Sequence, residues 1–367
     1  MIVGGGIAGA SAAYEMARAG ADVVLAEREP QPGYHTTGRS AATYLESYGN
    51  AAIRAITGAS RNFFDNPPDG FSDTAILTPR GCLIVATERD VAALDEELND
   101  PASAGLLTAV TQAEALEMSP ILRPEAVARG HYDASAEDID VDALLQGFLR
   151  GFRAAGGNVV TDAQVMALDR SGEAWKVQTR AGNISAGIVV NAAGAWADQM
   201  AIMAGAAPIQ LLPKRRTAVT IDPGEPAADW PMTGDIAETW YFRPEGGALL
   251  ISPADETLSP PCDAQPDEMD VATVADRIER ATRLKIARLL SSRAGLRCFV
   301  EDKTPVVGFA GDIEGFFWLA GQGGYGIQTS PAMGRIAAAL AAGDELPADV
   351  AANGLSADDL SPRRITS

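Results

Sequence analysis

The feature that most constrains this chain is a glycine turn at its beginning, in the stretch MIVGGGIAGASAAYEMARAGADVVLAERE. Gly4, Gly6 and Gly9 form the pattern GxGxxG directly after a short apolar segment. In a dinucleotide-binding βαβ unit, the first glycine permits a tight turn and the second lets the backbone approach a pyrophosphate. The third lets helix and strand pack closely. The amino terminus of the helix that follows offers free N–H groups and partial positive charge to phosphates.

The residues around this turn have the order that the motif requires. A strand at residues 2–3 is followed by a helix over residues 8–19, with Ala8 at its start, and then by a strand over residues 22–26. Glu27 ends the second strand, where an acidic side chain can accept a hydrogen bond from a ribose hydroxyl and would repel a ribose phosphate. The sequence therefore predicts a Rossmann-like dinucleotide site that does not prefer NADP.

The segment after Glu27 favours a flavin over a nicotinamide. A nicotinamide enzyme would usually return to its sheet through another helix, whereas this chain continues as REPQPGYHTTGRSAATY. The backbone of such a loop of Gly, Thr and Ser residues can lie against a flat ring. The cofactor contacts expected here are Arg28, Thr36, Thr37, Gly38, Arg39, Ser40, Ala41 and Thr43.

A second glycine-rich stretch, GQGGYGIQTS at residues 321–330, follows a buried strand expected in EGFFWLAG. Its glycines let the backbone approach a ring and a substrate without a Cβ clash. We expect a helix to begin near Ile327 and Gln328, where its amino terminus can stabilise negative charge on a reduced flavin. The cofactor contacts expected in this stretch are Gly323, Tyr325, Gly326, Ile327 and Gln328.

Composition and charge exclude several classes of protein. The chain has 49 acidic and 29 basic residues, and this net charge of -20 disfavours nucleic acid and anionic membranes as partners. Three scattered cysteines and two histidines argue against a disulfide framework and a metal site. No apolar run is long enough for a transmembrane segment, and the glycine turn starts too early for a signal peptide. We therefore expect a cytoplasmic protein, although the short first strand leaves open that residues precede Met1.

Several motifs resemble those of the D-amino acid oxidase superfamily of FAD enzymes and, more narrowly, bacterial D-arginine dehydrogenases. They are EREPQPGYHTTGRSAA, VVNAAGAWAD, LPKRRTAV, AGLRCFVEDKTPVVGF and EGFFWLAGQGGYGIQTSPAMG, in the order of the family and over almost the whole chain. The resemblance implies a two-domain α/β fold, in which a Rossmann-like FAD-binding domain is joined to a β-sheet substrate-binding domain. The FAD-binding domain would be discontinuous, over residues 1–47, 135–205 and 295–367, and the substrate-binding domain would cover residues 48–134 and 206–294. Val165 and Gly194 are further expected FAD contacts, and the FAD is expected to be non-covalent because no Cys or His lies in an attachment motif.

Helix caps are predicted at three places. Asp140 can cap a helix over residues 141–157, and Thr111 with Glu114 has the pattern of a capping box. Asp270 can cap a helix that we expect over residues 271–290.

The activity that the resemblance implies is oxidative deamination of D-amino acids. A hydride passes from the α-carbon to the flavin and leaves an imine, which gives a 2-oxo acid and ammonia. Because the cofactor performs this chemistry, the protein has to orient the substrate and needs no nucleophile. Arg297 in AGLRCF is the leading candidate, since a guanidinium fork matches a carboxylate in two hydrogen bonds. An ion pair with Glu301 is the alternative reading.

The resemblance assigns four further residues to the substrate. The hydroxyl of Tyr241 would meet the carboxylate, and Arg216 would contact the substrate as a second arginine. The carbonyl of Gly324 would accept a hydrogen bond from the amine, and Tyr48 would line the pocket of the side chain. Packing in the core is the alternative for both tyrosines.

The chain departs from D-arginine dehydrogenases in the pocket of the side chain. Cys82 in PRGCLIV stands where those enzymes have a glutamate, and Thr43 stands where they have a histidine. A neutral thiol cannot pair with a guanidinium at pH 7. Asp235 or Glu238 could supply the missing charge; otherwise neutral D-amino acids are expected.

Other functions remain open at this point. An oxidase of glycine, sarcosine or another secondary amine would use the same fold. A glycerol-3-phosphate type dehydrogenase would need more cationic groups, and a non-catalytic flavoprotein would not need Arg297 with Tyr241. A nicotinamide dehydrogenase is the last alternative. The sequence leaves open whether oxygen or a quinone reoxidises the flavin, and what the oligomeric state is.

Overall fold

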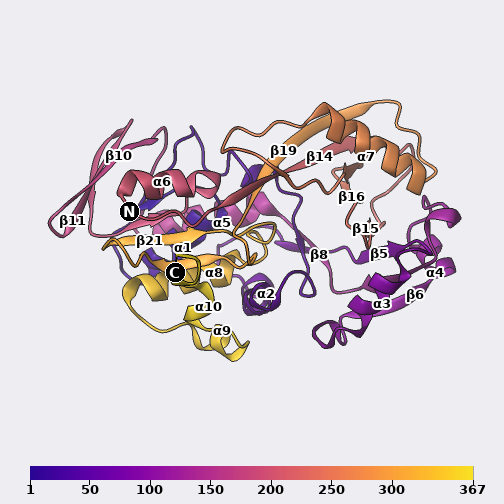
Figure 1. Cartoon of the computed structure of the whole chain (residues 1–367), viewed down its shortest axis with the longest axis horizontal. Helices are drawn as coiled ribbons and strands as arrows, with labels where there is room; N and C mark the ends of the chain where they lie inside the picture. Colours follow the sequence, from indigo (N-terminus) through magenta and orange to yellow (C-terminus); the bar gives the residue numbers. More distant parts are fainter. Residues whose placement is uncertain (367) are drawn as a thin grey trace.

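The predicted βαβ unit is present in the computed structural model, which describes residues 1–366. β1 (Ile2–Val3) leads through the glycine turn into α1 (Ile7–Arg18), and β2 (Val24–Ala26) pairs parallel with β1. The helix begins at Ile7 because residue 6, its N-cap, is extended. This unit belongs to one of two lobes, and both termini lie on that lobe (Figure 1).

A six-stranded sheet forms the centre of this first lobe. Its order is β20 (Val306–Phe309), β21 (Phe316–Ala320), β13 (Val189–Asn191), β1, β2 and β9 (Asn158–Val160). All pairs are parallel except β20 with β21. The sheet draws on all three segments that the sequence assigns to the FAD-binding domain; the boundaries of that domain remain a prediction.

Helices cover one face of this sheet. α1 packs against α5 (Val141–Ala154) and α8 (Ser330–Ala342), and α2 (Ala51–Asp65) packs against α8. The other face carries α6 (Ala197–Ala204) and a small sheet of β10 (Val165–Ser171), β11 (Ala174–Thr179) and β12 (Gly182–Ala186) (Figure 1). Buried apolar residues form a separate core on each face.

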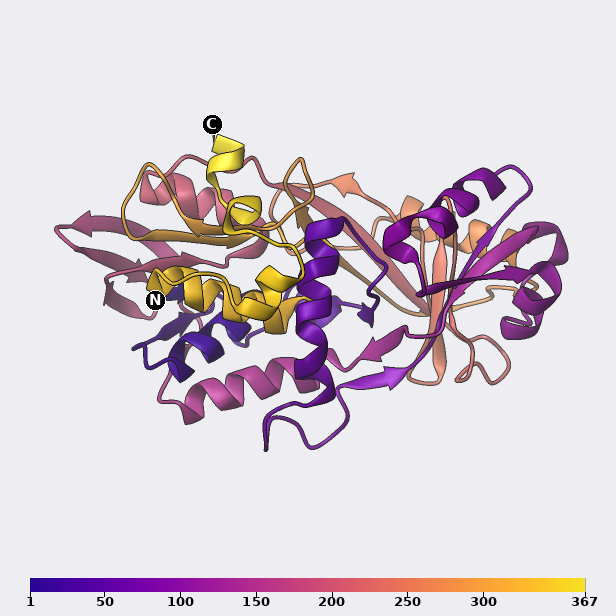
Figure 2. The same ribbon diagram turned by 90° about the horizontal axis from the view of Figure 1, so that it is seen from below.

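The second lobe is built on a nine-stranded sheet. Its order is β18 (Thr257–Leu258), β14 (Leu212–Ile221), β17 (Ala248–Ser252), β16 (Tyr241–Glu245), β15 (Met232–Asp235), β5 (Cys82–Ala86), β7 (Arg129–Asp133) and β6 (Leu107–Thr111). β19 (Leu289–Phe299) pairs with β14, and α3 (Val91–Asn99), α4 (Gln112–Met118) and α7 (Glu268–Ala281) also lie in this lobe (Figure 2).

A second small sheet, of β3 (Thr43–Tyr44), β8 (Glu137–Ile139) and β4 (Leu77–Pro79), lies where the chain passes between the lobes. The remaining elements are single turns: η1 (Thr37–Arg39), η2 (Pro101–Ser103), η3 (Pro124–Ala126), η4 (Gly194–Trp196), α9 (Ala348–Ala352), α10 (Ala357–Leu360) and α11 (Arg363–Thr366). Strands from distant parts of the chain meet in the sheet of each lobe. The residues on either side of the space between the lobes are therefore fixed in position by a sheet.

Two of the three predicted helix caps are confirmed. Asp140 accepts a hydrogen bond from the amide of Ala143 at 2.9 Å, and Thr111 forms the capping box of α4. The prediction for Asp270 is wrong. Asp267 caps α7, which ends at residue 281, and the carboxylate of Asp270 pairs with Arg215 at 2.8 Å. The helix expected near Ile327 begins three residues later, at the start of α8.

Among residues 1–366, no helix has the length and apolar character to cross a membrane. In the same part of the chain, no group of three or more His, Cys, Asp or Glu side chains is placed to hold a metal ion.

Candidate active site

Two cavities meet between the glycine turns and the second lobe. The larger has a volume of about 630 Å³ and the smaller about 200 Å³. Both are lined by Gly6, Thr36, Thr37, Ala192 and Gly194, so they form one elongated cleft. A dinucleotide needs such a cleft, with its phosphates at the narrow middle and a ring at each end.

The middle of the cleft fits a pyrophosphate. A Cβ atom at Gly9 would lie 1.9 Å from the carbonyl oxygen of Gly4, so helix and strand approach too closely for any side chain there. At Gly6 a Cβ atom would meet only the Thr37 hydroxyl, at 3.3 Å, and at Gly194 nothing within 4 Å. Bare backbone therefore faces the cleft beside the amino terminus of α1, which is the arrangement that binds phosphates.

The smaller cavity contains the predicted ribose-binding residue. Glu27 lines it together with Gly4, Arg28 and Val165. The carboxylate of Glu27 accepts hydrogen bonds from the backbone amides of Gly5, at 2.7 Å, and Glu29, at 2.8 Å. Burial raises the pKa of Glu27, and these two amides act in the opposite direction. The carboxylate is thus fixed in position at the edge of the cavity.

The loop after Glu27 forms one wall of the larger cavity. Of its predicted cofactor contacts, this cavity is lined by Thr36, Thr37, Arg39, Ser40, Ala41 and Thr43. Gly38 lines neither cavity; its amide donates to the carbonyl of Gly33 at 2.7 Å and closes the turn. Gly9 lines neither cavity either, so both glycines shape the backbone instead of facing the cleft.

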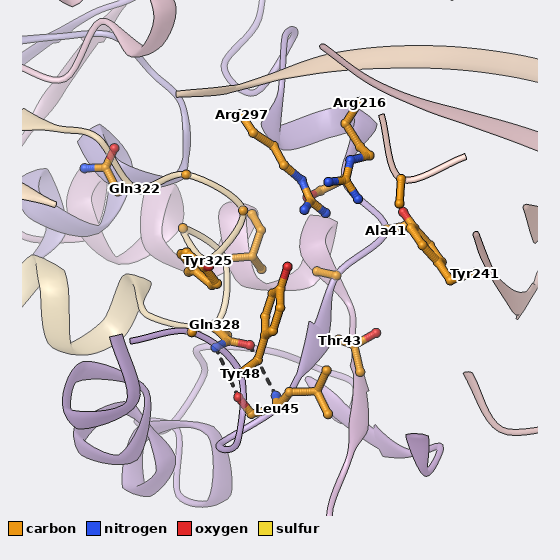
Figure 3. A pocket seen from close by; sticks show the side chains of 18 of the residues that line it. Ala41, Thr43, Leu45, Tyr48, Arg216, Tyr241, Arg297, Gln322, Tyr325 and Gln328 are labelled. Carbon is orange, nitrogen blue, oxygen red and sulfur yellow. Dashed lines mark hydrogen bonds between the residues drawn. The ribbon is translucent and has the colours of Figure 1, made fainter. Parts of the chain in front are cut away.

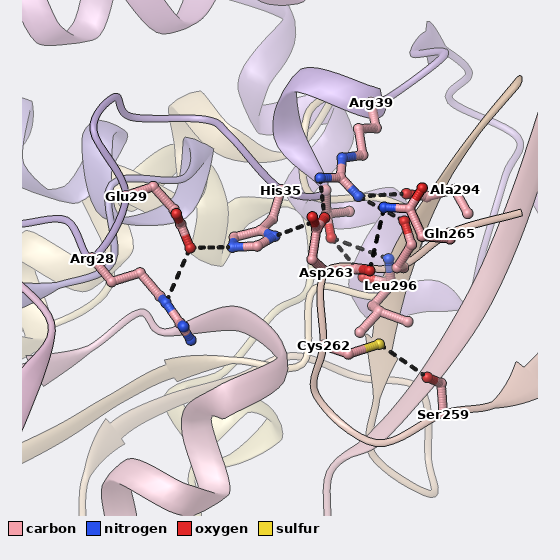
Figure 4. A network of polar contacts seen from close by, with 12 residues as sticks. Arg28, Glu29, His35, Arg39, Ser259, Cys262, Asp263, Gln265, Ala294 and Leu296 are labelled. Atoms are coloured by element: carbon pink, nitrogen blue, oxygen red, sulfur yellow. Dashed lines mark hydrogen bonds and ion pairs between the residues drawn. The ribbon is translucent and has the colours of Figure 1, made fainter. Parts of the chain in front are cut away.

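A loop of the second lobe, residues 259–267, holds this wall in place (Figure 4). The guanidinium of Arg39 pairs with Asp263 and donates to the carbonyls of Ala264, at 2.8 Å, and Ala294, at 3.1 Å. His35 contacts Glu29 at 2.9 Å and lies 4.0 Å from Asp263. Arg39 therefore joins the two lobes at the wall of the larger cavity.

The second glycine-rich stretch lies across the larger cavity. All five predicted contacts line it: Gly323, Tyr325, Gly326, Ile327 and Gln328. The side-chain amide of Gln328 exchanges two hydrogen bonds of 3.2 Å with the backbone of Leu45 and donates to the Thr57 hydroxyl at 2.9 Å (Figure 3). These hydrogen bonds fix the second glycine-rich stretch against Leu45 and against Thr57 of α2.

Two arginines from neighbouring strands point into the same part of the larger cavity (Figure 3). In the pairing of β14 with β19, Arg297 lies opposite Lys214 and Arg216 lies opposite Gly295, so the two arginines are diagonal neighbours on one face. Burial lowers the pKa of Arg216, and the positive charge of Arg297 lowers it further. Like charges held this close favour binding of an anion.

Only one of these arginines has a carboxylate partner. Arg216 donates to the carbonyl of Asp255 at 3.0 Å and lies 3.6 Å from the carboxylate of Glu256. Among the described residues, no carboxylate lies within 4.0 Å of Arg297, and the ion pair with Glu301 is not formed. Burial lowers the pKa of Arg297, but interactions with Tyr48, Tyr241 and Tyr325 together outweigh burial and leave this pKa above its usual value.

Aromatic residues and a glycine complete this end of the cavity. Tyr48 and Tyr241 both line it, and the ring of Tyr48 lies 4.9 Å from that of Tyr325. A Cβ atom at Gly324 would lie 2.8 Å from a guanidinium nitrogen of Arg297, so the arginine rests against bare backbone. All five residues that the sequence assigns to the substrate therefore line one cavity.

The four residues predicted for the pocket of the substrate side chain also line this cavity: Cys82, Thr43, Asp235 and Glu238. They differ from one another in burial and in charge. Cys82 is buried, and burial, with smaller contributions from Asp133 and Glu97, raises the pKa of its thiol to about 12. The carboxylate of Asp235 accepts from the amides of Thr239 and Trp240, at 2.7 and 3.0 Å, and so closes a turn.

The last two of these predicted residues lie at the same wall. Glu238 is exposed, with a positive φ of 50°. The hydroxyl of Thr43 lies 3.6 Å from the sulfur of Met232. Neither position supplies a buried negative charge.

Sequence reasoning missed several lining residues. Ala192 lies in the motif VVNAAGAWAD and Gln322 in the stretch GQGGYGIQTS, so the neighbours of each residue already indicated the cofactor site. Asp133, His131 and Glu97 gave no signal, because each is a single polar residue in an ordinary strand or helix.

A cleft with two glycine turns and an arginine pair at one end fits a flavin-dependent oxidoreductase. In agreement, the family model described as FAD dependent oxidoreductase (DAO) matches residues 1–340. The chain therefore belongs to the DAO family of FAD-dependent oxidoreductases, and FAD is its cofactor.

Similar proteins agree with this assignment. The chain is 26% identical to the mitochondrial dimethylglycine dehydrogenase of Homo sapiens over 91% of its length and 41% of that protein's. It thus spans about two fifths of the dimethylglycine dehydrogenases that it matches. It is also 26% identical to the glycine oxidase of Geobacillus kaustophilus, over 66% of this chain and 63% of that protein.

Solved structures share the fold. The L-proline dehydrogenase from P. horikoshii has a TM-score of 0.85 at 22% identity, covering 100% of this chain and 96% of that one. The glycine oxidase from Geobacillus kaustophilus has a TM-score of 0.79 at 23% identity, covering 94% of both chains. The names of these relatives refer to dimethylglycine, glycine and L-proline, and not to D-arginine, so the comparisons support the superfamily and not the narrower resemblance.

Proposed function

We propose that this protein oxidises the carbon–nitrogen bond of amino acids of the glycine and N-alkylglycine type. The observation that carries this proposal is Arg297, a partly buried guanidinium that faces the cavity without a carboxylate partner among the described residues. A substrate carboxylate would supply that partner. The relatives named for glycine and dimethylglycine support this substrate class.

The residues of the cavity would orient the substrate. Arg297 and Arg216 would bind the carboxylate, since two guanidinium groups on one face can each donate to it. The hydroxyls of Tyr48 and Tyr241, which act on the charge of Arg297, would contact the same group. The carbonyl of Gly324 would accept a hydrogen bond from the substrate nitrogen.

When bound, FAD supplies the oxidant, because its flavin ring accepts the hydride that leaves the carbon next to the nitrogen. The nitrogen lone pair then forms the carbon–nitrogen double bond, so the amine must reach the cavity unprotonated. Loss of the hydride from the α-carbon leaves an imine, or an iminium ion where the amine is tertiary, which water hydrolyses to a 2-oxo acid and an amine or ammonia. A proton-transferring side chain is not required, and orientation by the arginine pair is the protein's main contribution.

The predicted FAD contacts stay part of this proposal. The middle of the cleft would hold the pyrophosphate against Gly6 and Gly194, and Glu27 would accept from the ribose in the smaller cavity. The flavin would lie in the larger cavity, between the loop around Ser40 and the stretch around Gly326.

Oxidation of D-amino acids is a second candidate. The larger cavity continues past Tyr48 to Cys82, which leaves room for a side chain on the α-carbon.

A glycerophosphate oxidase also has this fold, with a TM-score of 0.82 at 19% identity.

A substrate panel with an artificial electron acceptor tests these alternatives. It should contain glycine, sarcosine, N,N-dimethylglycine, proline, both enantiomers of the common amino acids, and glycerol phosphate. We expect turnover of carboxylated amines and none of glycerol phosphate. Turnover of glycerol phosphate alone, or of no carboxylated amine, would overturn the proposal.

A further inference from the structure

The larger cavity has a second, acidic end. One face of two paired strands lines it there, with Cys82 and Ile84 on β5 and His131 and Asp133 on β7. Asp133 lies directly opposite Cys82 in the pairing of these strands, so the two side chains are neighbours on the cavity face.

Asp133 is a buried carboxylate without a cationic partner. It is only 2% exposed, and among the described residues no Lys, Arg or His lies within 4.0 Å of it. Its oxygens accept from the hydroxyl of Ser47, at 3.2 Å, and from the amide and hydroxyl of Ser135, at 2.9 and 2.6 Å. Buried charges in proteins are normally paired, because leaving one unpaired costs stability.

A second pair extends the acidic end. The Nε2 atom of His131 lies 3.0 Å from a carboxylate oxygen of Glu97, and both residues line the cavity. His131 is 4% exposed, and its Nδ1 atom is buried without a hydrogen-bond partner in the structure. Buried polar atoms without a partner are uncommon in folded proteins, so this nitrogen is a candidate contact for a polar ligand.

The two ends of the cavity are joined by neighbouring residues. Ser47, which donates to Asp133, precedes Tyr48 in the chain, and the hydroxyl of Tyr48 acts on the charge of Arg297. The cavity therefore has a guanidinium without a carboxylate at one end and a buried carboxylate without a cation at the other.

We propose that the preferred substrate carries a second cationic group, a primary ammonium or a guanidinium, which Asp133 binds while Arg297 holds the carboxylate. Glu97, fixed by His131, adds negative charge at the mouth of the same end. Asp133 and Glu97 are then specificity-determining residues, and Asp133 takes the place of the charge that Cys82 lacks. This inference rests on the carboxylate site of the proposed function and on its second candidate, an amino acid with a side chain, because glycine and N-alkylglycines have no group that could reach Asp133.

Matched substrates test it directly. Arginine and citrulline differ mainly in the charge of the side chain, as do lysine and norleucine, and both enantiomers of each should be compared by kcat/KM. We expect the cationic member to be preferred by roughly ten- to a hundredfold, the value of one charged hydrogen bond. Asp133→Asn should reduce the arginine-to-citrulline ratio to near one, since the amide keeps the shape and can still accept from Ser135.

Asp133→Asn changes a buried residue and could prevent folding, so two variants at exposed glutamates provide a second test. Glu97→Gln should lower the arginine-to-citrulline ratio by roughly two- to fivefold, as expected for a partly exposed charge. Glu96→Gln, the same change at an exposed neighbour on α3 that does not line the cavity, should leave the ratio unaltered.

The outcomes separate this inference from the proposed function. Turnover of sarcosine or norleucine without preference for lysine or arginine would overturn the inference and leave the proposed function standing. A preference that survives both Asp133→Asn and Glu97→Gln would also overturn it. If no carboxylated amine is oxidised, both fail.

Discussion

Arg297 presents a cation to a cavity, and the residues around it are arranged to keep it there. Tyr48 and Tyr241 stabilise its charge, and bare backbone at Gly324 supports its planar group. Arg216 beside it is held through the carbonyl of Asp255. At the scale of single residues, the account therefore depends on the charge and the position of one guanidinium.

The first prediction concerns that charge. Arg297→Met should lower kcat/KM for a carboxylated amine by about ten- to a hundredfold, because a charged hydrogen bond contributes roughly 1.5–3 kcal/mol. Steady-state kinetics measures this loss, and the FAD content should match that of the parent. Arg288→Met, at an exposed arginine just before β19, is the control. Turnover by Arg297→Met at the parent rate would show that the arginine does not bind substrate.

The second prediction concerns its position. Gly324→Ala places a methyl group within 2.8 Å of the guanidinium and must displace it, so we expect kcat/KM to fall at least about tenfold. Gly187→Ala is the control, because a Cβ atom there has nothing within 4 Å. Equal kinetics for the two variants would mean that the contact between Gly324 and Arg297 has no role in turnover.

At the scale of elements, the loop at residues 259–267 connects the second lobe to the wall of the cofactor cleft. Arg39 makes this connection through Asp263 and Ala264, and η1 carries Arg39 itself. The wall residues on either side of Arg39, Thr37 and Ser40, line the larger cavity. Weakening the contacts of this loop should therefore lower the affinity for FAD more than it lowers kcat.

The third prediction follows from this contact. Asp263→Asn should raise the dissociation constant of FAD by up to about fivefold, the range of a solvent-exposed ion pair, while the hydrogen bond from Arg39 to Ala264 persists. Fluorescence of released flavin measures this constant. Asp344→Asn removes an exposed carboxylate elsewhere and should leave it unaltered. Weaker binding in both variants would point to net charge instead of the loop.

Elements also show why some of the site was predictable and some was not. The turn around Gly6 and the stretch around Gly326 are local patterns, so their elements could be predicted from the sequence alone. Arg297 could be chosen by its resemblance to a known family. Asp133 could not, because its importance depends on its pairing with Cys82 across two strands, and the sequence does not encode that register in any short pattern. Asp235 and Glu238, where the sequence predicts the missing charge, line the same cavity, and their role there stays a prediction.

At the scale of the whole molecule, the cofactor cleft joins segments that lie far apart in the chain. Gly6, Gly194 and Gly323 come from its beginning, middle and end, and all line the larger cavity. A ligand bound there contacts every segment of the first lobe at once. Its binding free energy therefore adds to the stability of the folded lobe.

The fourth prediction uses this linkage. Removing FAD should lower Tm, and adding it back should raise Tm with concentration; at a hundred times Kd the expected stabilisation is about 2.7 kcal/mol. A thermal melt at several FAD concentrations measures the effect. Acid precipitation should release all the flavin into solution, because binding is expected to be non-covalent. Flavin that stays with the precipitate would contradict this expectation.

The central claim is that the bound flavin is reduced by a carboxylated amine held on Arg297. The most direct measurement is anaerobic mixing of the holoenzyme with sarcosine, norleucine and arginine in turn, with the visible absorbance of the flavin followed over time. We predict loss of the oxidised-flavin absorbance with at least one of these amines, and a rate at limiting substrate that is at least about tenfold lower in Arg297→Met. A flavin that stays oxidised with every carboxylated amine, or that the parent and Arg297→Met reduce equally fast, would contradict the account.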